Sequence, residues 1–413
     1  MWQNTANRAL QDLRLAARNL IRHRRRSAFA LCTVGGGVIA FLLAGGFIQW
    51  VLYGMREAAI HSQLGHIQIT RPHFFSEGQS NPYRYLLPNK APDTLTKPSP
   101  GIQTLAPRLV FGGLLSLGES TVSFLGEAID PQKEAPITRA IQVLEGKDLT
   151  ESAANAVILG EGLAASVDAK PGDRIVLLST LEGGGFNAIE AQVAGIFATS
   201  TKAYDDVTLR APLPIAHKLM GVNGATSWVM LLNDTTQTDP MVAYFRTQLD
   251  ASQYEVTAWH ELADFYNKTV ALFAKQVGVV RLLIGFIVIL SISNTLSMTV
   301  MERTSEIGTS MAVGVRRSGI LRLFLSEGTL IGIAGGAGGV LIGTALAEII
   351  SAVGIPMPPP PGMTHGYTGQ ILVSPSLIID ALLLAIGTTL IASIFPAWKA
   401  SRMTIVDALR HQR

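Results

Sequence analysis

The sequence predicts an α-helical membrane protein with four transmembrane helices plus a large mixed α/β extracytoplasmic domain inserted between helices 1 and 2. Three observations lead to this fold class. Four apolar stretches have the length, roughly 20 residues, that a helix needs to cross a bilayer. Lys and Arg cluster beside alternate ends of these stretches. Between the first two stretches, strand-like and helix-like patterns alternate over the length of a soluble domain.

The composition indicates a chain that is partly membrane-embedded and partly soluble. Of the 413 residues, 48% are hydrophobic and 15% are charged, which is too apolar for an ordinary soluble enzyme and too polar for a chain buried in lipid throughout. The formal net charge is only +3 and the basic residues lie beside apolar stretches, so we expect no nucleic-acid binding. The single cysteine, Cys32, excludes an intramolecular disulfide.

Four transmembrane helices are predicted at 27–55 (TM1), 271–301 (TM2), 328–347 (TM3) and 377–398 (TM4). TM1 is longer than the apolar region of a cleavable signal peptide, about 7–15 residues, so we expect a retained anchor. Before it, residues 1–26 combine an apolar stripe with arginines at helical spacing. This pattern favours a cytoplasmic amphipathic elbow helix on the membrane surface over a simple basic stop for insertion.

Positive charge predicts the orientation, because Lys and Arg stay on the cytoplasmic side of a membrane. We expect both termini in the cytoplasm of a multi-pass protein of the bacterial inner (cytoplasmic) membrane. The predicted segments between the helices are a periplasmic domain at 56–270, a cytoplasmic helix and loop at 302–327, a periplasmic Pro-rich loop at 348–376 and a cytoplasmic tail at 399–413. The basic flanks are Arg14, Arg18, Arg22 and Arg24 to Arg26; Arg303, Arg316, Arg317 and Arg322; and Lys399, Arg402, Arg410 and Arg413.

The predicted periplasmic domain has patterns typical of an α/β or α+β domain. Helices are expected around 213–220 and 240–249, a loop at 81–100, and a hairpin or flexible tip at Glu182–Gly185. Strands are expected at 64–70, 121–125, 156–159, 173–179 and 189–197.

TM3 carries a high density of glycine. Glycine weakens a helix in water, whereas in lipid it lets two helix backbones approach closely, so we predict that another helix packs on this face. The expected packing residues are Gly332, Gly335, Gly336, Gly339 and Gly343. Pro396 is expected to bend or end TM4, and Pro356–Pro361 to form a rigid extended loop whose role the sequence does not assign.

Motifs for catalysis or cofactor binding are not found in the sequence. No Gly-rich loop ends in Lys-Ser or Lys-Thr, so we expect nucleotide hydrolysis to come from another chain. Gly160-x-Gly162 precedes too short a helix for a dinucleotide site, and the histidines lack zinc-ligand spacing. We therefore predict no catalytic residue, cofactor or metal in this chain. Glu348 and Asp380 lie at the outer ends of TM3 and TM4, where a carboxylate in contact with water is favoured over an ion pathway.

Two segments resemble the cytoplasmic motifs of the FtsX/MacB-like ABC transporter permease family. The first contains Glu302-Arg303-Thr304-Ser305-Glu306-Ile307-Gly308 and continues to Glu327, and the second is Phe395–Arg402 with Val406–Arg410. Segments 126–134, 157–178 and 193–197 resemble the family's extracytoplasmic core. In layout the chain is closest to the lipoprotein-releasing (LolC/LolE-type) permeases, and it differs from MacB in lacking a fused ATPase domain.

The resemblance implies a subunit that is not itself an enzyme. It implies a dimer with a second permease copy or a homologous permease, docked on an ABC ATPase dimer that binds ATP and Mg. The helix after TM2 inserts into the ATPase in this family, which implies ATPase-coupling roles for Glu302, Arg303, Glu306, Ile307 and Gly308. ATP-driven movement is then relayed by mechanotransmission to the periplasmic domain, which acts on a hydrophobic or lipid-linked cargo such as a lipoprotein.

Two alternative functions remain. One is an FtsX-like transmembrane signalling scaffold that controls a periplasmic hydrolase and moves no cargo. The other is an ATP-independent membrane receptor, which the cytoplasmic motif disfavours. The sequence leaves open the cargo, the choice between homodimer and heterodimer, and any further periplasmic or outer-membrane partner.

Overall fold

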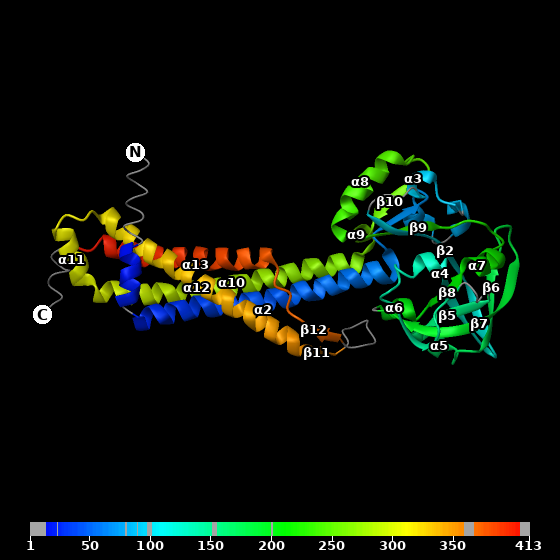
Figure 1. Cartoon of the computed structure of the whole chain (residues 1–413), viewed down its shortest axis with the longest axis horizontal. Coiled ribbons are helices and arrows are strands. Elements are labelled where there is room, and N and C mark those ends of the chain that lie inside the picture. The colour runs from blue at the N-terminus through cyan, green and yellow to red at the C-terminus, as the bar shows by residue number, and fades with distance from the viewer. Residues whose placement is uncertain are drawn as a thin grey trace. The chain divides into compact units, whose positions relative to one another are not determined.

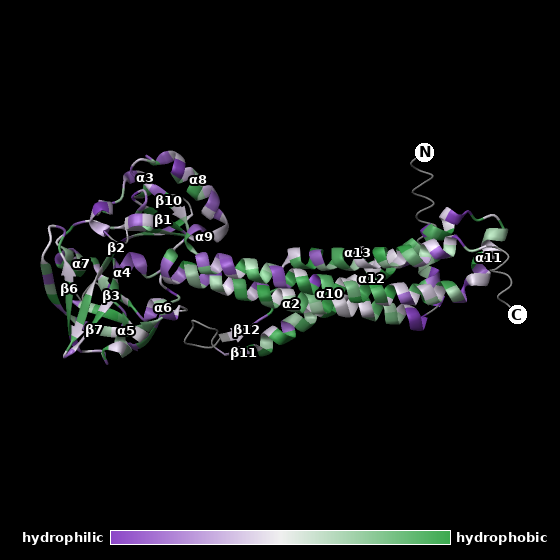
Figure 2. Ribbon diagram, turned by 180° about the vertical axis from the view of Figure 1, so that it is seen from behind, coloured by the Kyte–Doolittle hydropathy of each residue, from purple (hydrophilic) through white to green (hydrophobic). Residues whose placement is uncertain are grey.

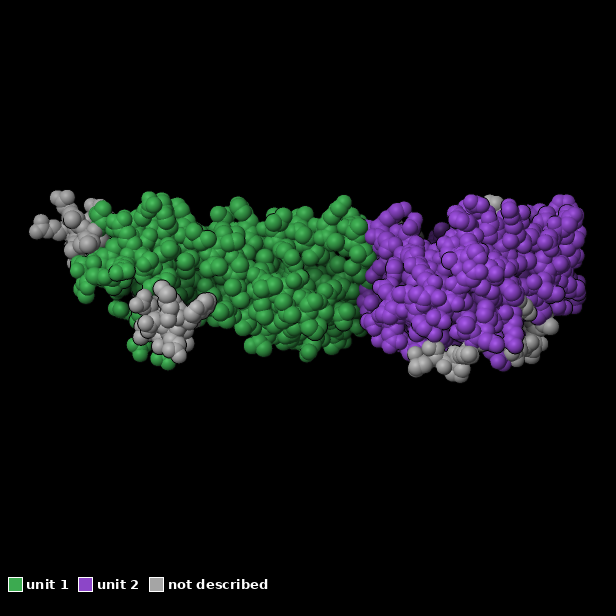
Figure 3. All heavy atoms as spheres, turned by 90° about the horizontal axis from the view of Figure 1, so that it is seen from above, with its two compact units in different colours: residues 1–52, 269–356, 368–413 green, residues 53–268, 357–367 purple. Residues whose placement is uncertain are grey.

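The structure is a computed structural model that describes residues 14–22, 24–78, 81–88, 90–96, 101–150, 155–199, 201–358 and 367–404. The chain divides into two compact units (Figures 1 and 3). Unit 1 consists of Met1–Leu52, Thr269–Pro356 and Thr368–Arg413. Unit 2 consists of Tyr53–Lys268 and Met357–Tyr367.

Four helices of the described chain are long and apolar enough to cross a membrane. They are α2 (Arg24–Ala59), α10 (Asp264–Glu302), α12 (Arg317–Val353) and α13 (Pro375–Ser401). Hydrophobic residues, green in Figure 2, run along most of each helix. The remaining described elements of this part of the chain are a helical segment at 14–22, α11 (Thr304–Ala312), β11 (Ile355–Met357) and β12 (Tyr367–Gly369).

The long helices extend beyond the apolar stretches that predicted them. The difference is largest for α12, which begins at Arg317 and not at residue 328, so the predicted segment 302–327 holds α11 and the first turns of α12. Hydropathy reports only the part of a helix that suits hydrocarbon, whereas backbone hydrogen bonding continues the helix through its polar flank. Pro396 lies inside α13, which continues to Ser401, so the proline does not end this helix. The predicted segments 1–13, 359–361 and 406–410 lie outside the described residues.

The core of unit 1 is a cluster of apolar side chains shared by all four long helices. Each long helix presents one buried stripe to the others, and most of its remaining apolar side chains stay exposed on the outside of the bundle, as expected for helices surrounded by lipid. The buried cluster comprises Ala30, Val34, Val38, Phe41, Leu42, Val288, Ile292, Leu296, Ile331, Leu377, Ala381, Ala385 and Ala392.

Unit 2 is a mixed α/β unit built on one ten-stranded sheet. The strand order is β10-β1-β9-β2-β3-β8-β5-β7-β4, with β6 paired to β2 and β7. The pairs β3–β8 and β5–β7 are parallel and the others are antiparallel. The strands are β1 (Ile67–Thr70), β2 (Ile102–Leu117), β3 (Ser120–Ile129), β4 (Gln142–Gly146), β5 (Ala156–Gly160), β6 (Arg174–Thr180), β7 (Phe186–Ala198), β8 (Thr208–Pro212), β9 (Ser227–Leu232) and β10 (Glu255–Ala258).

Helices cover the sheet of unit 2 at two separate apolar cores. In the first core, α7 (Leu213–Met220) packs with strands β2, β3, β5, β6, β7 and β8. In the second, α8 (Thr238–Gln248) packs with strands β1, β9 and β10. Shorter helical segments are η1 (Ile60–Leu64), η2 (Phe74–Gly78), η3 (Pro82–Tyr85), α3 (Asp93–Thr96), α4 (Pro131–Glu134), α5 (Glu161–Ser166), α6 (Lys202–Asp205), η4 (Thr235–Gln237) and α9 (Trp259–Leu262).

The sequence analysis missed β2, the longest strand of the sheet. Pro107 and the pair Gly112-Gly113 interrupt its apolar pattern, and both residue types are disfavoured inside strands. In the structure Pro107 is part of the strand and lies opposite Trp228 of β9. A Cβ on Gly113 would stand 1.9 Å from the carbonyl oxygen of Leu178 on β6. The glycine is therefore required by the close approach of β6.

Candidate functional site

The short helix α11 follows α10 after a turn at one residue. α10 ends at Glu302, and Arg303 has φ −94° and ψ 14°, outside the α-helical range. The hydroxyl of Thr304 donates to the carbonyl oxygen of Val300 over 3.1 Å and so ties the turn to α10. After α11, Gly314 adopts φ +107°, which favours glycine, and the chain reverses into α12.

Arg303 is buried and is the centre of an ion network beside α11. Its Nη1 donates to Oε1 of Glu327 on α12 over 2.9 Å, and its Nε donates to Oε2 of Glu306 on α11 over 3.2 Å. The same Oε1 of Glu327 accepts a hydrogen bond from Nδ2 of Asn19 over 2.7 Å. The guanidinium also lies over the ring of Phe324, 5.6 Å from its centroid. One guanidinium thus joins α11, α12 and, through Glu327, the helical segment 14–22.

Apolar side chains fasten the inner face of α11 to the bundle. Ile307 is buried on α11 and packs in a cluster with Phe324 of α12 and Ala397 of α13. Gly308 is also buried, whereas Thr309 beside it is exposed. α11 therefore has one face held against the long helices and one face turned outward.

The outward face of α11 forms a shallow depression with both polar and apolar lining. The lining residues are Glu306, Thr309, Ser310, Val313 and Val315. Val313 is 83% exposed and is the most exposed apolar side chain of this depression. Geometry of this kind, an exposed apolar residue beside a carboxylate on a rigidly held helix, suits docking to another protein.

Two arginines of the N-terminal basic flank reach the same end of the bundle. Nη1 of Arg22 lies 3.6 Å from Oε1 of Glu306, and Arg26 forms an ion pair with Glu302. These pairs are largely exposed, so each contributes little to stability, about 0–1 kcal/mol. They nevertheless place positive charge beside Glu302 at the end of α10 and Glu306 on α11.

The structure separates the five predicted coupling residues into two groups. Glu302 and Glu306 are exposed, whereas Arg303, Ile307 and Gly308 are buried in the unit. The buried three hold α11 in place, and the outward surface is made by residues that include Thr309, Ser310, Val313 and Val315. Sequence reasoning did not single out Glu327, although an acidic residue where an amphipathic stretch meets a glycine-rich span is a usable signal.

The predicted packing glycines of α12 lie on two adjacent faces. Gly335, Gly339 and Gly343 face α2: an added Cβ would stand 2.9 Å from Cβ of Val34, 2.7 Å from Cβ of Val38 and 3.0 Å from Cδ1 of Leu42, respectively. Gly332 and Gly336 face α13, with Cβ positions 2.2 Å from Oγ1 of Thr389 and 3.2 Å from Cβ of Ala385. Each set recurs at every fourth residue, which keeps it on one helix face. α12 thus lies close to two helices at once.

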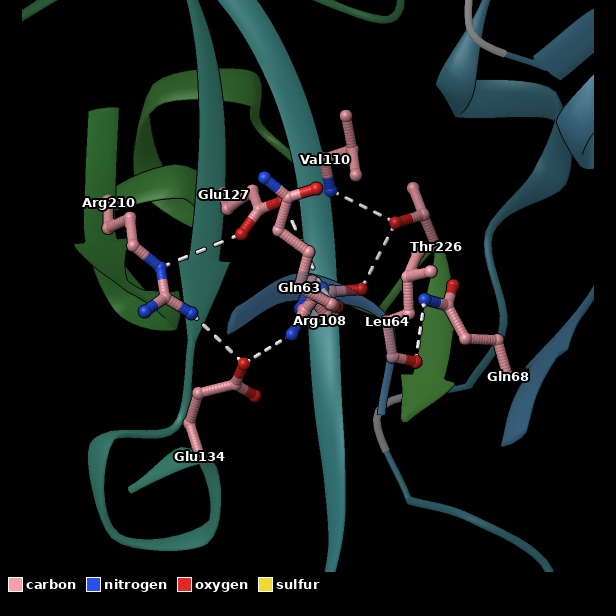
Figure 4. A network of polar contacts seen from close by, with 9 residues as sticks. All are labelled: Gln63, Leu64, Gln68, Arg108, Val110, Glu127, Glu134, Arg210 and Thr226. Atoms are coloured by element: carbon pink, nitrogen blue, oxygen red, sulfur yellow. Dashed lines mark hydrogen bonds and ion pairs between the residues drawn. The ribbon is translucent and has the colours of Figure 1, made fainter. Parts of the chain in front are cut away.

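Unit 2 contains a second network of charged side chains, in which Arg108 also donates to the backbone carbonyl of Gln63 (Figure 4). Glu134 of α4 binds Arg108 of β2 and Nη2 of Arg210 on β8, the latter over 3.0 Å, through the same Oε1. Nε of Arg210 lies 3.6 Å from Oε2 of Glu127 on β3. All four side chains are buried, and the two positive and two negative charges cancel. Such an arrangement leaves no net charge to attract a ligand, and the loss of one member would leave an uncompensated buried charge.

Neighbouring titratable groups of unit 2 are kept neutral by burial. Burial raises the pKa of Tyr204 well above its ordinary value, as does the charge of Glu127. Burial also lowers the pKa of His66 to about 4, with His61 and Arg56 contributing. Nδ1 of His66 accepts the backbone N–H of Leu232 over 3.1 Å, so the neutral tautomer carries its proton on Nε2. Within the described residues, no group of three or more His, Cys, Asp or Glu is arranged to hold a metal ion.

Two family models together match most of the chain. A family model described as the MacB-like periplasmic core domain matches residues 27–248, and one described as the FtsX-like permease C-terminal matches residues 278–405. The chain is 35% identical over 140 residues to the macrolide export ATP-binding/permease protein MacB of Syntrophobacter fumaroxidans, a match that covers 33% of this chain and 17% of that relative. It is 24% identical to the lipoprotein-releasing system transmembrane protein LolC of Xylella fastidiosa, over 77% of this chain and 80% of that relative. Among solved structures, it is similar to the periplasmic region of MacB from Actinobacillus actinomycetemcomitans, with a TM-score of 0.37, 15% identity, and coverage of 51% of this chain and 94% of that chain.

Apolar helices of membrane-spanning length, a large α/β unit and both family models define the class of protein as an ABC transporter permease. The chain belongs to the FtsX/MacB-like permease family, because the MacB-like core model alone matches residues 27–248, more than half of its 413 residues.

Proposed function

We propose that this chain is the permease subunit of an ABC transporter that couples ATP hydrolysis by a separate ATPase to movement of a hydrophobic or lipid-linked cargo. One observation carries the proposal: α11 is anchored through Arg303 and Ile307 and turns a partly apolar surface outward. A helix held in this way transmits force, because its buried face cannot slide without displacing the long helices.

The proposed topology has TM1 to TM4 formed by α2, α10, α12 and α13, with both termini in the cytoplasm. The main segment of unit 2, Tyr53–Lys268, then connects the first and second membrane helices, and its segment Met357–Tyr367 connects the third and fourth, both on the periplasmic side of a bacterial inner membrane. Support comes from the basic residues near α11 and the helical segment 14–22, which the positive-inside rule assigns to the cytoplasm. A reporter fused near residue 310 that became active in the periplasm would reject this orientation.

The proposed partners are an ABC ATPase dimer on the cytoplasmic side and a second permease, identical or homologous. ATP and Mg bind to the ATPase in this scheme. A relative named as a lipoprotein-releasing system protein, similar over most of both chains, supports a lipoprotein-like cargo. A cargo crosslinked to unit 2 in membranes would favour transport, whereas activation of a periplasmic hydrolase without a crosslinked cargo would favour the scaffold.

Docking is tested with two substitutions on the outward face of α11 in the complex purified with its ATPase. Glu306→Lys reverses the one carboxylate of the depression, and Val313→Asp places a charge on its most exposed apolar residue without touching the Arg303 network. We expect both variants to insert normally and to lose bound ATPase and permease-dependent ATP hydrolysis. Val207→Asp, a change of the same kind at a 41% exposed position of unit 2, is the matched control. Normal ATPase retention and hydrolysis in both α11 variants would reject the docking site.

A further inference from the structure

Glu327 is a buried carboxylate in the first turns of α12. It is 3% exposed, and burying a carboxylate costs a large free energy unless the charge is compensated. Two side chains compensate the carboxylate charge by donating hydrogen bonds to the same oxygen, Oε1. The donors are Nη1 of Arg303 at 2.9 Å and Nδ2 of Asn19 at 2.7 Å. A single atom of α12 thus binds both the turn before α11 and the helical segment 14–22.

The shape of the arginine head group makes this contact directional. A guanidinium is a planar fork, so when one N–H is fixed the directions of the others are fixed too. With Nη1 on Glu327, the Nε of Arg303 points to Glu306 at 3.2 Å, and Phe324 covers the face of the plane at 5.6 Å. Arg303 is also the N-cap residue of α11, and its backbone angles, φ −94° and ψ 14°, set the direction in which α11 leaves α10.

The contact between Glu327, Arg303 and Asn19 is not closely packed on every side. A cavity of about 30 Å³ adjoins it, lined by residues that include Asn19, Arg26, Thr299, Arg303 and Glu327. The volume suits one or two waters, and Nη1 of Arg26 is buried there without a partner in the described part of the chain.

We propose that Glu327 is a positioning residue for ATPase coupling. It orients Arg303, and through Arg303 it fixes α11 against α12 and the helical segment 14–22, so that these three elements move together when α11 is pushed. This rests on the proposed function, because the push comes from an ATPase docked on α11. If Glu327 only compensated the charge of Arg303, a neutral pair of side chains of similar volume could replace both residues without loss of coupling. A positioning role requires the ion pair itself.

The decisive comparison is between a broken pair and an apolar pair. Glu327→Gln keeps the shape and removes the charge that orients Arg303, whereas the double variant Arg303→Met with Glu327→Met removes both charges at similar volume. A buried ion pair replaced by apolar residues commonly keeps or gains stability. Glu348→Gln makes the same chemical change at an exposed position of α12 and is the matched control.

Coupling and positioning are read out separately in the full chain reconstituted with its ATPase. Coupling is the permease-dependent ATP hydrolysis rate. Positioning is the distance between spin labels at Ala312→Cys on α11, outside the depression, and Arg18→Cys on the helical segment, both exposed, in a chain whose single Cys32 is replaced by serine. Thermal unfolding checks that each variant is folded.

We expect the double variant to unfold at the temperature of the parent chain and to show a broader distribution of distances between the labels. Its rate of permease-dependent ATP hydrolysis should fall at least about tenfold, which corresponds to a free-energy difference of about 1.4 kcal/mol. Glu327→Gln is expected to lose the rate and the narrow distance as well, and Glu348→Gln to lose neither. A double variant that fails to fold, or that folds with parental distance and rate, assigns the pair a structural role only and overturns the proposal. If the parent chain itself binds no ATPase, the proposed function fails, while the label distances still decide whether Glu327 positions α11.

Discussion

Nη2 of Arg281 on α10 donates to Oδ2 of Asp380 on α13 over 2.9 Å, and the same guanidinium lies 5.4 Å from the ring centroid of Phe41 on α2. The sequence analysis expected Asp380 to be a carboxylate in contact with water at the end of a span. The structure gives it a cationic partner on a neighbouring helix. Three of the four long helices are thereby joined at one point, and about half of each charged side chain stays exposed.

Removing one member of this pair should destabilise the bundle modestly. We expect Asp380→Leu to lower the free energy of unfolding by about 1 kcal/mol, a typical size for a polar contact between membrane helices. The double variant Arg281→Leu with Asp380→Leu should recover most of the loss, because no unpaired charge remains. Thermal unfolding in detergent measures both. If the Asp380→Leu variant and the parent chain were equally stable, the ion pair would contribute nothing to the stability of the bundle.

The two glycine faces of α12 predict a strong dependence on position along one helix. Gly339→Ala places a methyl group 2.7 Å from Cβ of Val38 and 2.8 Å from the carbonyl oxygen of Gly35, so α2 must move away. Overpacking of this kind costs about 1–3 kcal/mol. Gly338→Ala, whose methyl group would meet nothing within 4 Å, is the control and should leave stability unchanged or slightly higher. A similar loss for both variants would contradict the close packing of α12 on α2.

Unit 2 should lose stability as the pH falls below about 6.5. The pKa of His66 is lowered by burial to about 4, so between these values the unfolded chain binds a proton that the folded chain does not. Unfolding therefore becomes easier with falling pH, by up to about 1.4 kcal/mol per pH unit, and the effect levels off near pH 4.

This dependence is measurable by hydrogen exchange of the β1 and β9 amides in the full chain at pH 7 and pH 5. His66→Gln should flatten the dependence, and His260→Gln, a change at a far more exposed histidine, should not. A pH profile identical in the parent chain and the His66 variant would rule out this residue as the source.

Glu134 should be among the most sensitive positions of unit 2. Glu134→Ala leaves Arg108 and Arg210 buried without their shared acceptor, and breaking a buried pair in this way costs about 3–5 kcal/mol. Lys133→Ala, next to it and exposed, should change stability by less than about 0.5 kcal/mol. Chemical denaturation followed by tryptophan fluorescence, to which the buried Trp228 and Trp259 of unit 2 contribute, compares the two variants. A small cost at Glu134 would mean that water or rearranged neighbours replace its carboxylate.

Local features of the chain were sufficient to predict the membrane helices and much of the periplasmic-type unit. The four apolar stretches, the α7 helix at 213–220 and the strand β5 at 156–160 all follow from short-range hydrophobicity and turn residues. β2 could not be predicted in this way. Proline and glycine are disfavoured in strands, so Pro107 and Gly113 argue against a strand when only the local sequence is considered. The pairing of Pro107 with β9 and the close approach of β6 to Gly113 are seen only in the folded sheet.

The division between local and distant information is clearest around α11. The sequence by itself determined the number of apolar helices, the basic flanks and the spacing of four between glycines of α12, because each depends on residues close together in the chain, whereas the short helix after α10 was expected only from the family resemblance. Only the tertiary structure decided that Arg303 lies against Glu327, that Gly339 faces α2 while Gly336 faces α13, and that Arg108 shares Glu134 with Arg210. These contacts join residues far apart in the sequence, and they are selected by the packing of whole elements, which local propensity does not encode.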